Sequence, residues 1–245
     1  MLHVENLSKS FGGVKAMNGV SLRFPERSLT AIIGPNGAGK TTFFNLISGH
    51  LRADSGHVHF RGEDIVGLPR LEIVRRGICR AFQVASIFPD LTLEESVIAA
   101  VTSHQNGSWS LFRRFPAPSA KARAHEIIEL LGLTPRAKTL SRNLSHGEQK
   151  LLDIALALAL EPKVLLLDEP TAGMGSEERW KMIDKVYQLW KAEDLTIIFI
   201  EHDMDIVFKI AETIYVLKYG QVLAQGTPDE IRRNQDVIDA YLGTD

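Results

Sequence analysis

The sequence predicts an α/β fold with a mostly parallel sheet, and three observations support this class. Short apolar runs typical of strands buried on both faces occur at 29–33, 163–167 and 196–200. A segment with helical character follows each run, at 40–48, 176–190 and 204–210. Strands that alternate with helices favour parallel pairing through right-handed crossovers. A run at 214–217 predicts a further strand of the same sheet.

The middle of the chain has a different, mainly helical character. Thr92–Glu95 has the capping-box pattern of a helix start, and a second helix is expected from about Ala120 to Leu131. Residues 104–119 hold glycine, proline and aromatic residues without a clear period and predict a surface loop. We therefore expect a single domain of 245 residues in which a helical subdomain, about 85–160, is inserted into a core, about 1–84 and 161–245.

Composition limits the classes of function. The chain is 44% hydrophobic and 24% charged, which is typical of a globular protein. Its 28 Lys and Arg against 30 Asp and Glu give a formal charge of -2, so a basic nucleic-acid binder is disfavoured. Cys79 is the single cysteine, which excludes a disulfide within the chain.

A glycine-rich stretch between the first buried strand and its helix has the spacing of a phosphate-binding loop. It matches G-x-x-x-x-G-K-[ST] with Gly34, Pro35, Asn36, Gly37, Ala38, Gly39, Lys40 and Thr41, and Thr42 follows. Its glycines let backbone N–H groups turn toward phosphate oxygens, and the helix N-terminus adds partial positive charge. We expect Lys40 to reach the β- and γ-phosphates and Thr41 to place its hydroxyl on Mg²⁺. The alternative is an ordinary glycine-rich turn, and the strand–loop–helix context argues against it.

Two carboxylates end the second buried strand, in Val164–Glu169. The carboxyl end of a strand in an open parallel sheet is where ligands bind. We expect Asp168 to hold Mg²⁺ through water and Glu169 to act as the general base on the attacking water. An acidic turn after a strand is the alternative, and the motif becomes specific through its pairing with the phosphate loop.

A third motif, Leu144–Gln149, precedes a helix of about a dozen residues. Ser145 and Glu148 form a capping box, which alone explains the pattern structurally. The functional interpretation uses the same geometry: Ser145 and Gly147 at a helix N-terminus make an anion site, aimed at the γ-phosphate held by another copy of the chain.

The three motifs stand in the order found in ATP-binding subunits of ABC transporters, and the chain resembles that family over essentially its whole length. The resemblance implies the ABC-ATPase type of P-loop NTPase fold, with an antiparallel N-terminal β subdomain, and it implies ATP and Mg²⁺ as cofactors. It assigns Gln83 to the Q-loop, as a catalytic residue and metal ligand, and His202 to the catalytic switch position. Phe11 stands where an aromatic side chain stacks on adenine.

This sequence departs from the family pattern in two places. The family signature is usually LSGGQ, and here His146 replaces its first glycine and Glu148 its glutamine. The segment after the acidic strand usually carries an acidic residue, and here Gly175 takes that position. The second departure puts communication between two nucleotide sites in question but not nucleotide binding.

Further motifs resemble one branch of the family, the importers of branched-chain amino acids. They are Phe11–Gly13, Pro170–Met174, Glu201–Met204 and the tail 226–243. Urea and amide importers and the ATPase of lipopolysaccharide export are similar and stay as alternatives. The resemblance implies a second ATP-binding chain, identical or paralogous, membrane permease subunits, an indirect role for a substrate-binding protein, and a peripheral place on the cytoplasmic face of the inner membrane.

Three other classes compete with this interpretation. A GTPase would carry N-K-x-D for guanine, and the sequence contains no such tetrapeptide. Soluble ABC proteins of translation or DNA maintenance generally have two nucleotide domains or long coiled coils, and this sequence predicts neither. A regulatory nucleotide binder without hydrolysis is disfavoured by Glu169 and His202.

Overall fold

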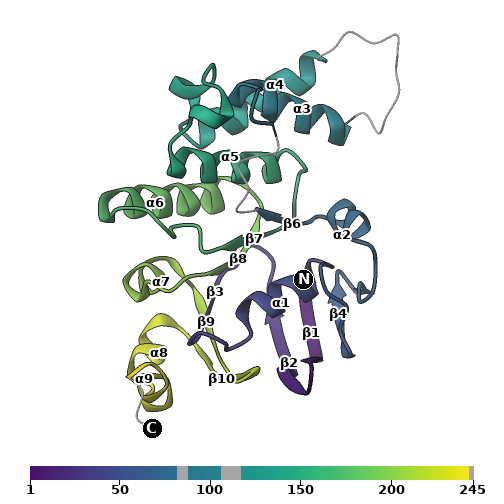
Figure 1. The fold of residues 1–245 in the computed structure, drawn as a ribbon, viewed down its shortest axis with the longest axis vertical. Helices are drawn as coiled ribbons and strands as arrows, with labels where there is room; N and C mark the ends of the chain where they lie inside the picture. The colour runs from purple at the N-terminus through teal and green to yellow at the C-terminus, as the bar shows by residue number, and fades with distance from the viewer. Residues whose placement is uncertain (82–87, 106–116, 243–245) are drawn as a thin grey trace. The chain divides into compact units, whose positions relative to one another are not determined.

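The computed structural model describes residues 1–81, 88–105 and 117–242 (Figure 1). The chain divides into two compact units. The first comprises residues 1–78, 163–170 and 194–245, and the second comprises residues 79–162 and 171–193. The second unit thus includes the helix that follows the acidic strand.

An antiparallel sheet opens the first unit. Its strand order is β2-β1-β4-β5, with β1 Leu2–Phe11, β2 Val14–Phe24, β4 Ser55–Phe60 and β5 Glu63–Asp64. Val20, Leu22 and Phe24 alternate with exposed residues and point into the core, as their period of two predicts. The predicted antiparallel N-terminal β region is confirmed.

The second sheet has the order β10-β9-β3-β8-β7-β6. Its strands are β3 Leu29–Ile33, β6 Ile78–Ala81, β7 Val164–Asp168, β8 Thr196–Ile200, β9 Thr213–Lys218 and β10 Gln221–Gly226. Strand β3 pairs in parallel with β8 and β9, and β8 pairs in parallel with β7, whereas β10 is antiparallel to β9. Strands β3 and β8 are buried along their whole length, which explains their unbroken apolar sequences.

Helices and aromatic residues complete the first unit. The helices are α1 Lys40–Ile47, α2 Arg70–Arg76, α7 Met204–Ile210, α8 Pro228–Arg233 and α9 Gln235–Leu242. Phe24, Phe43 and Tyr215 are buried, and the ring of Phe24 meets that of Tyr215 edge-on at 5.6 Å between centroids. Helices α8 and α9 lie beside β10 (Figure 1).

The second unit is mainly helical. It contains α3 Leu93–Gln105, α4 Pro118–Leu130, α5 His146–Leu158, α6 Ser176–Ala192 and two short 3₁₀ segments, η1 Thr134–Arg136 and η2 Ser141–Asn143. Helix α3 packs against α4 and α5 (Figure 1). Most of the predicted loop at 104–119 lies outside the described residues.

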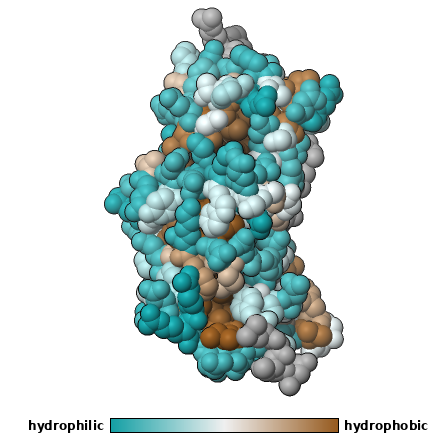
Figure 2. Space-filling model, turned by 90° about the vertical axis from the view of Figure 1, so that its left-hand side faces the viewer, coloured by the Kyte–Doolittle hydropathy of each residue, from teal (hydrophilic) through white to brown (hydrophobic). Residues whose placement is uncertain are grey.

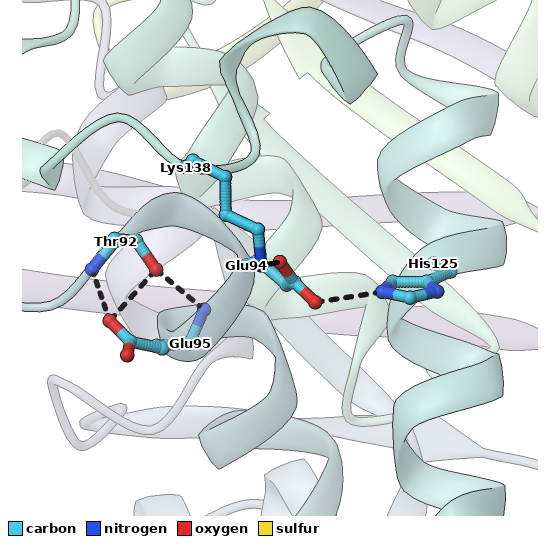
Figure 3. Close-up of polar contacts among 5 residues, drawn as sticks. All are labelled: Thr92, Glu94, Glu95, His125 and Lys138. Carbon is cyan, nitrogen blue, oxygen red and sulfur yellow. Dashed lines mark hydrogen bonds and ion pairs between the residues drawn. The ribbon is translucent and has the colours of Figure 1, made fainter.

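A buried carboxylate joins three segments of this unit (Figure 3). Glu94, in the first turn of α3, is 6% exposed. His125 of α4 lies 2.9 Å from Glu94 Oε1 through Nε2, and Lys138 pairs with the other carboxylate oxygen. Beside it, Thr92 and Glu95 exchange the reciprocal bonds of the predicted capping box. Hydrogen bonds from His125 and Lys138 hold the pKa of Glu94 below its usual value against the opposing effect of burial.

We predict that Glu94→Gln lowers the free energy of unfolding by about 1–3 kcal/mol at neutral pH, because a charge-assisted pair becomes a neutral contact. A carboxylate whose pKa falls on folding stabilises the protein above the pKa of the unfolded chain, and this contribution disappears as the pH falls through the pKa of the folded state. Urea unfolding at several pH values should therefore show the parent and variant converging in acid. Glu126→Gln, on the exposed side of α4, is the control.

Hydrophilic residues predominate on the face drawn in Figure 2, and hydrophobic residues appear there in small separate groups. Large apolar side chains exposed among the described residues are Phe11, Val14, Leu71, Phe88, Tyr187, Tyr219 and Tyr241. Within the described ranges, every helix is too short or too polar to cross a membrane.

Candidate functional site

The loop between β3 and α1 is shaped by glycine. Gly34, Gly37 and Gly39 have φ angles of 149°, 81° and 102°, in the region that side chains disfavour. A Cβ at Gly34 would lie 2.1 Å from the Leu217 carbonyl oxygen, and one at Gly39 would lie 2.5 Å from that of Ala16. The close approach of two neighbouring strands therefore demands glycine at both positions.

Lys40 turns back into this loop. Its Nζ donates to the carbonyl oxygens of Gly34 at 2.6 Å and Pro35 at 3.1 Å. Burial lowers the pKa of Lys40, and the nearby carboxylates of Glu169 and Asp168 oppose that shift. Carbonyl dipoles thus hold the Lys40 ammonium at the centre of the loop. Oxygens with a larger negative charge can replace these carbonyl oxygens as its partners.

The N-terminus of α1 opens toward the loop. Its N-cap residue is Gly39, which has no side chain to accept hydrogen bonds from the first N–H groups of the helix. Such unpaired donors and the helix dipole favour an anion at this end. The arrangement suits a phosphate chain curled along the loop.

An open cavity of about 340 Å³ lies at this end of the sheet. Its lining residues are Ala16, Asn36, Gly37, Ala38, Gly39, Lys40, Thr41, Thr42, Glu169 and His202. The folded chain therefore brings the phosphate loop together with one residue that follows β7 and one that follows β8. The size is within the range of small-molecule sites.

Glu169 and His202 contact one another at the edge of this cavity. His202 Nε2 lies 2.9 Å from Glu169 Oε1, and both side chains are partly exposed. Because an ionised carboxylate only accepts hydrogen bonds, Nε2 carries the proton. Glu169 has a φ of 48°, and its N–H donates to Ile200 O at 3.0 Å. This left-handed conformation carries backbone strain of the kind found at functional sites.

Two other predicted site residues, Asp168 and Phe11, lie at the ends of strands. Asp168 ends β7 and is half-buried, one residue before Glu169. Phe11 ends β1, is 46% exposed and pairs with Val14 of β2. Gln83 lies outside the described residues.

Two oxygen donors suitable for Mg²⁺ lie near the phosphate loop, Thr41 in sequence and Asp168 in the fold. Thr41 supplies a hydroxyl in the first turn of α1, and Asp168 supplies a carboxylate at the end of β7. These hard donors fit Mg²⁺, which often binds through one or two protein ligands together with phosphate oxygens and water. Among the described residues, no group of three or more His, Cys, Asp or Glu could hold a metal by itself.

Ser145 and Gly147 belong to the second unit, at the N-terminus of α5. Ser145 Oγ accepts from the Glu148 N–H at 3.2 Å, and Glu148 Oε2 accepts from the Ser145 N–H at 2.8 Å. The predicted capping box is confirmed. An oxygen that accepts in this way still has its hydroxyl proton to donate, so the cap is compatible with binding an anion.

The first departure from the family pattern, His146, contacts the segment that leads to the second, Gly175. His146 Nε2 lies 3.2 Å from the carbonyl oxygen of Ala172. A Cβ at Gly173 would lie 3.2 Å from the same nitrogen. Since a carbonyl oxygen only accepts, His146 donates this hydrogen bond and fastens the first turn of α5 to the segment that precedes α6.

Three residues near these motifs were not found from the sequence. Ala16 lines the cavity from β2, and Arg136 binds Glu148 with its Nε at 2.6 Å from Oε1. Although Tyr241, in α9, is 39% exposed, partial burial raises its pKa to about 12, and a hydrogen bond with the Gly34 backbone opposes the rise. The glycines of the loop could have suggested a close neighbour, but nothing in the sequence indicated which strand supplies it.

Comparison with known proteins agrees with this geometry. Residues 17–172 match the family described as ABC transporter, and residues 221–245 match the family described as branched-chain amino acid ATP-binding cassette transporter. The chain is 40% identical to the high-affinity branched-chain amino acid transport ATP-binding protein LivG of Salmonella typhimurium, over 99% of this chain and 98% of the relative.

Solved structures show the same fold. A structure of the ADP conformation of MJ1267, an ATP-binding cassette of an ABC transporter, aligns with a TM-score of 0.87 and 32% identity, covering 99% of this chain and 98% of the other. The dimeric structure of MJ0796, a bacterial ABC transporter cassette, aligns with a TM-score of 0.79 and 27% identity, covering 93% and 99%. The predicted fold class is confirmed, and the chain belongs to the ABC transporter family of ATP-binding cassettes.

Proposed function

We propose that this chain is the ATP-hydrolysing subunit of an importer for branched-chain amino acids. The observation that carries the proposal is the grouping of Lys40, Glu169 and His202 around the cavity of the phosphate loop. The match of the C-terminal segment, and the similarity to LivG over the whole chain, support the substrate class.

Binding begins with an exchange of partners at Lys40. Its Nζ leaves the carbonyl oxygens of Gly34 and Pro35 for the β- and γ-phosphate oxygens of ATP, which bear full charge. The N–H groups of the loop and of the first turn of α1 bind the same phosphates. Phe11 stacks on adenine, as the family resemblance implies, and Ala16 lines the cavity of the phosphate loop.

Hydrolysis requires a base for the attacking water. Glu169 accepts the proton of that water, and His202 holds the carboxylate through its Nε2–H. Thr41, Asp168 and Gln83 are the residues that would hold Mg²⁺, which neutralises charge on the phosphates when bound. Lys40 stabilises the charge that builds up on the transferring group.

A second ATP-binding chain, identical or paralogous, completes the site. The N-terminus of α5, with Ser145 and Gly147, caps the γ-phosphate held by the partner, and the cap is lost after hydrolysis. The dimeric cassette among the similar structures supports this arrangement. Integral membrane permease subunits receive the movement from this chain, which binds them at the cytoplasmic face of the inner membrane, and a substrate-binding protein delivers the amino acid to them.

Uptake in cells tests the substrate class. Deleting the gene should abolish saturable uptake of radiolabelled leucine, isoleucine and valine, and the parent gene should restore it while Glu169→Gln should not. Normal amino-acid uptake with loss of urea uptake, or with lipopolysaccharide retained in the inner membrane, would contradict the proposed substrate and favour one of the alternatives.

A further inference from the structure

The N-terminus of α5 carries more negative charge than an anion site should. Glu148 stands three residues after the N-cap Ser145, and its carboxylate closes the capping box. Glu178 of α6 places a second carboxylate over the same turn, because a Cβ at Gly147 would lie 2.2 Å from Glu178 Oε1. A γ-phosphate brought to this turn therefore meets like charges as well as the helix dipole.

Glu148 remains ionised in this setting. Burial tends to raise its pKa, but hydrogen bonds from the Ser145 N–H and from Arg136 outweigh that effect and lower it on balance. Its two oxygens have different partners: Oε2 accepts from Ser145 and Oε1 accepts from Arg136. The carboxylate is thus held in place by the backbone on one side and by a cation on the other.

Arg136 comes from a neighbouring turn that is closed by backbone hydrogen bonds. It ends η1, where its N–H donates to Leu133 O at 2.9 Å and its carbonyl accepts from the Thr139 N–H at 2.8 Å. Its Nε lies 2.6 Å from Glu148 Oε1, whereas its side chain is 57% exposed. The guanidinium therefore sits beside the signature turn with donors that extend beyond the contact made by Nε.

We propose that Arg136 is a positioning residue of the shared nucleotide site, which neutralises Glu148 so that the N-terminus of α5 can accept the γ-phosphate held by a second copy of the chain. The proposal rests on the function proposed above and adds to it a residue that acts through Glu148. Without Arg136, the carboxylate of the capping box repels the phosphate that Ser145 and Gly147 bind. With a neutral amide at position 148, the cation is no longer needed, and a Gln side chain keeps the capping box.

The test compares the ATP-driven dimer of four full-length chains, each in the Glu169→Gln background: the parent, Arg136→Ala, Glu148→Gln and the double variant. Sedimentation velocity with ATP and Mg²⁺ gives the dimer dissociation constant. We expect Arg136→Ala to raise this constant about tenfold, and we expect the double variant to match Glu148→Gln alone. Arg136→Lys should give an intermediate value, since it keeps the charge and loses the planar fork.

Two further readouts separate this role from a structural one. ADP binding to the single chain should be equal in all four proteins, because Arg136 and Glu148 do not line the cavity of the phosphate loop. Thermal unfolding should also be similar, because an ion pair whose arginine is largely exposed to solvent contributes little to stability.

The outcomes distinguish a failure of the role of Arg136 from a failure of the shared site itself. A dimer unaffected by Arg136→Ala, or a double variant as weak as Arg136→Ala, overturns the role of Arg136 and leaves the proposed function standing. A parent chain that binds ATP but stays monomeric at every concentration overturns the shared site itself, and the role of Arg136 with it.

Discussion

Lys40→Ala is expected to abolish ATP hydrolysis, with a loss of at least about 10²-fold in turnover. Lys40 is the buried cation of the phosphate loop, and Glu169 and Asp168 are close enough to affect its pKa. Alanine leaves the developing charge on the transferring phosphoryl group without this partner. Release of inorganic phosphate from ATP by the purified chain, with and without its membrane partners, measures the effect.

A surface lysine provides the control for this variant. Lys121→Ala removes an exposed side chain of α4 and should hydrolyse ATP like the parent. Thermal unfolding should show that Lys40→Ala is folded, because the hydrogen bonds that the structure shows for the lysine are to carbonyl oxygens of its own loop. Near-normal hydrolysis by a folded Lys40→Ala protein would rule out the phosphate loop as the site of the reaction.

Glu169→Gln is expected to bind ATP and to hydrolyse it about 10²–10⁴-fold more slowly, the usual effect of losing a general base. The amide oxygen can still accept from His202 Nε2, so the geometry of the pair survives. The amide cannot take a proton from water, and its neutrality relieves repulsion with the γ-phosphate. The variant should therefore accumulate the ATP-bound state.

Single-turnover hydrolysis and nucleotide retention measure both parts of this expectation. Glu161→Gln, at an exposed position before β7, is the matched control and should behave like the parent. If Glu169→Gln turns over ATP at the parental rate, Glu169 is not the base and another group activates the water. A variant that fails to bind ATP would instead indicate that the carboxylate has a structural role in the loop.

The sequence predicted those features that depend on local pattern. The phosphate loop follows from the spacing of Gly34, Gly39 and Lys40, and the buried strands follow from runs such as Thr196–Ile200. The resemblance assigned Glu169 and His202 to one nucleotide site, and in the structure His202 Nε2 lies 2.9 Å from Glu169 Oε1. Parallel strands explain this proximity, because their carboxyl ends meet at one edge of the sheet.

Contacts that depend on tertiary packing could not be predicted from the sequence. Arg136 and His146 are separated in sequence from the groups that they bind. Nothing in the sequence identifies the partner of an exposed arginine or histidine side chain. Ala16 is an ordinary strand residue whose role arises from its approach to Gly39. These contacts are set by the packing of whole elements against one another rather than by residue type or period.

The most direct test of the shared site mixes two inactive chains. Lys40→Ala inactivates the phosphate loop but leaves α5 intact. Gly147→Asp leaves the loop intact but adds a charge at the N-terminus of α5, where a Cβ would already meet Glu178. A dimer with one chain of each kind holds one complete site, formed by the loop of the second chain and the α5 end of the first. We predict that each variant alone is inactive and that mixing them restores ATP hydrolysis. A mixture no more active than its two separate components would contradict the account.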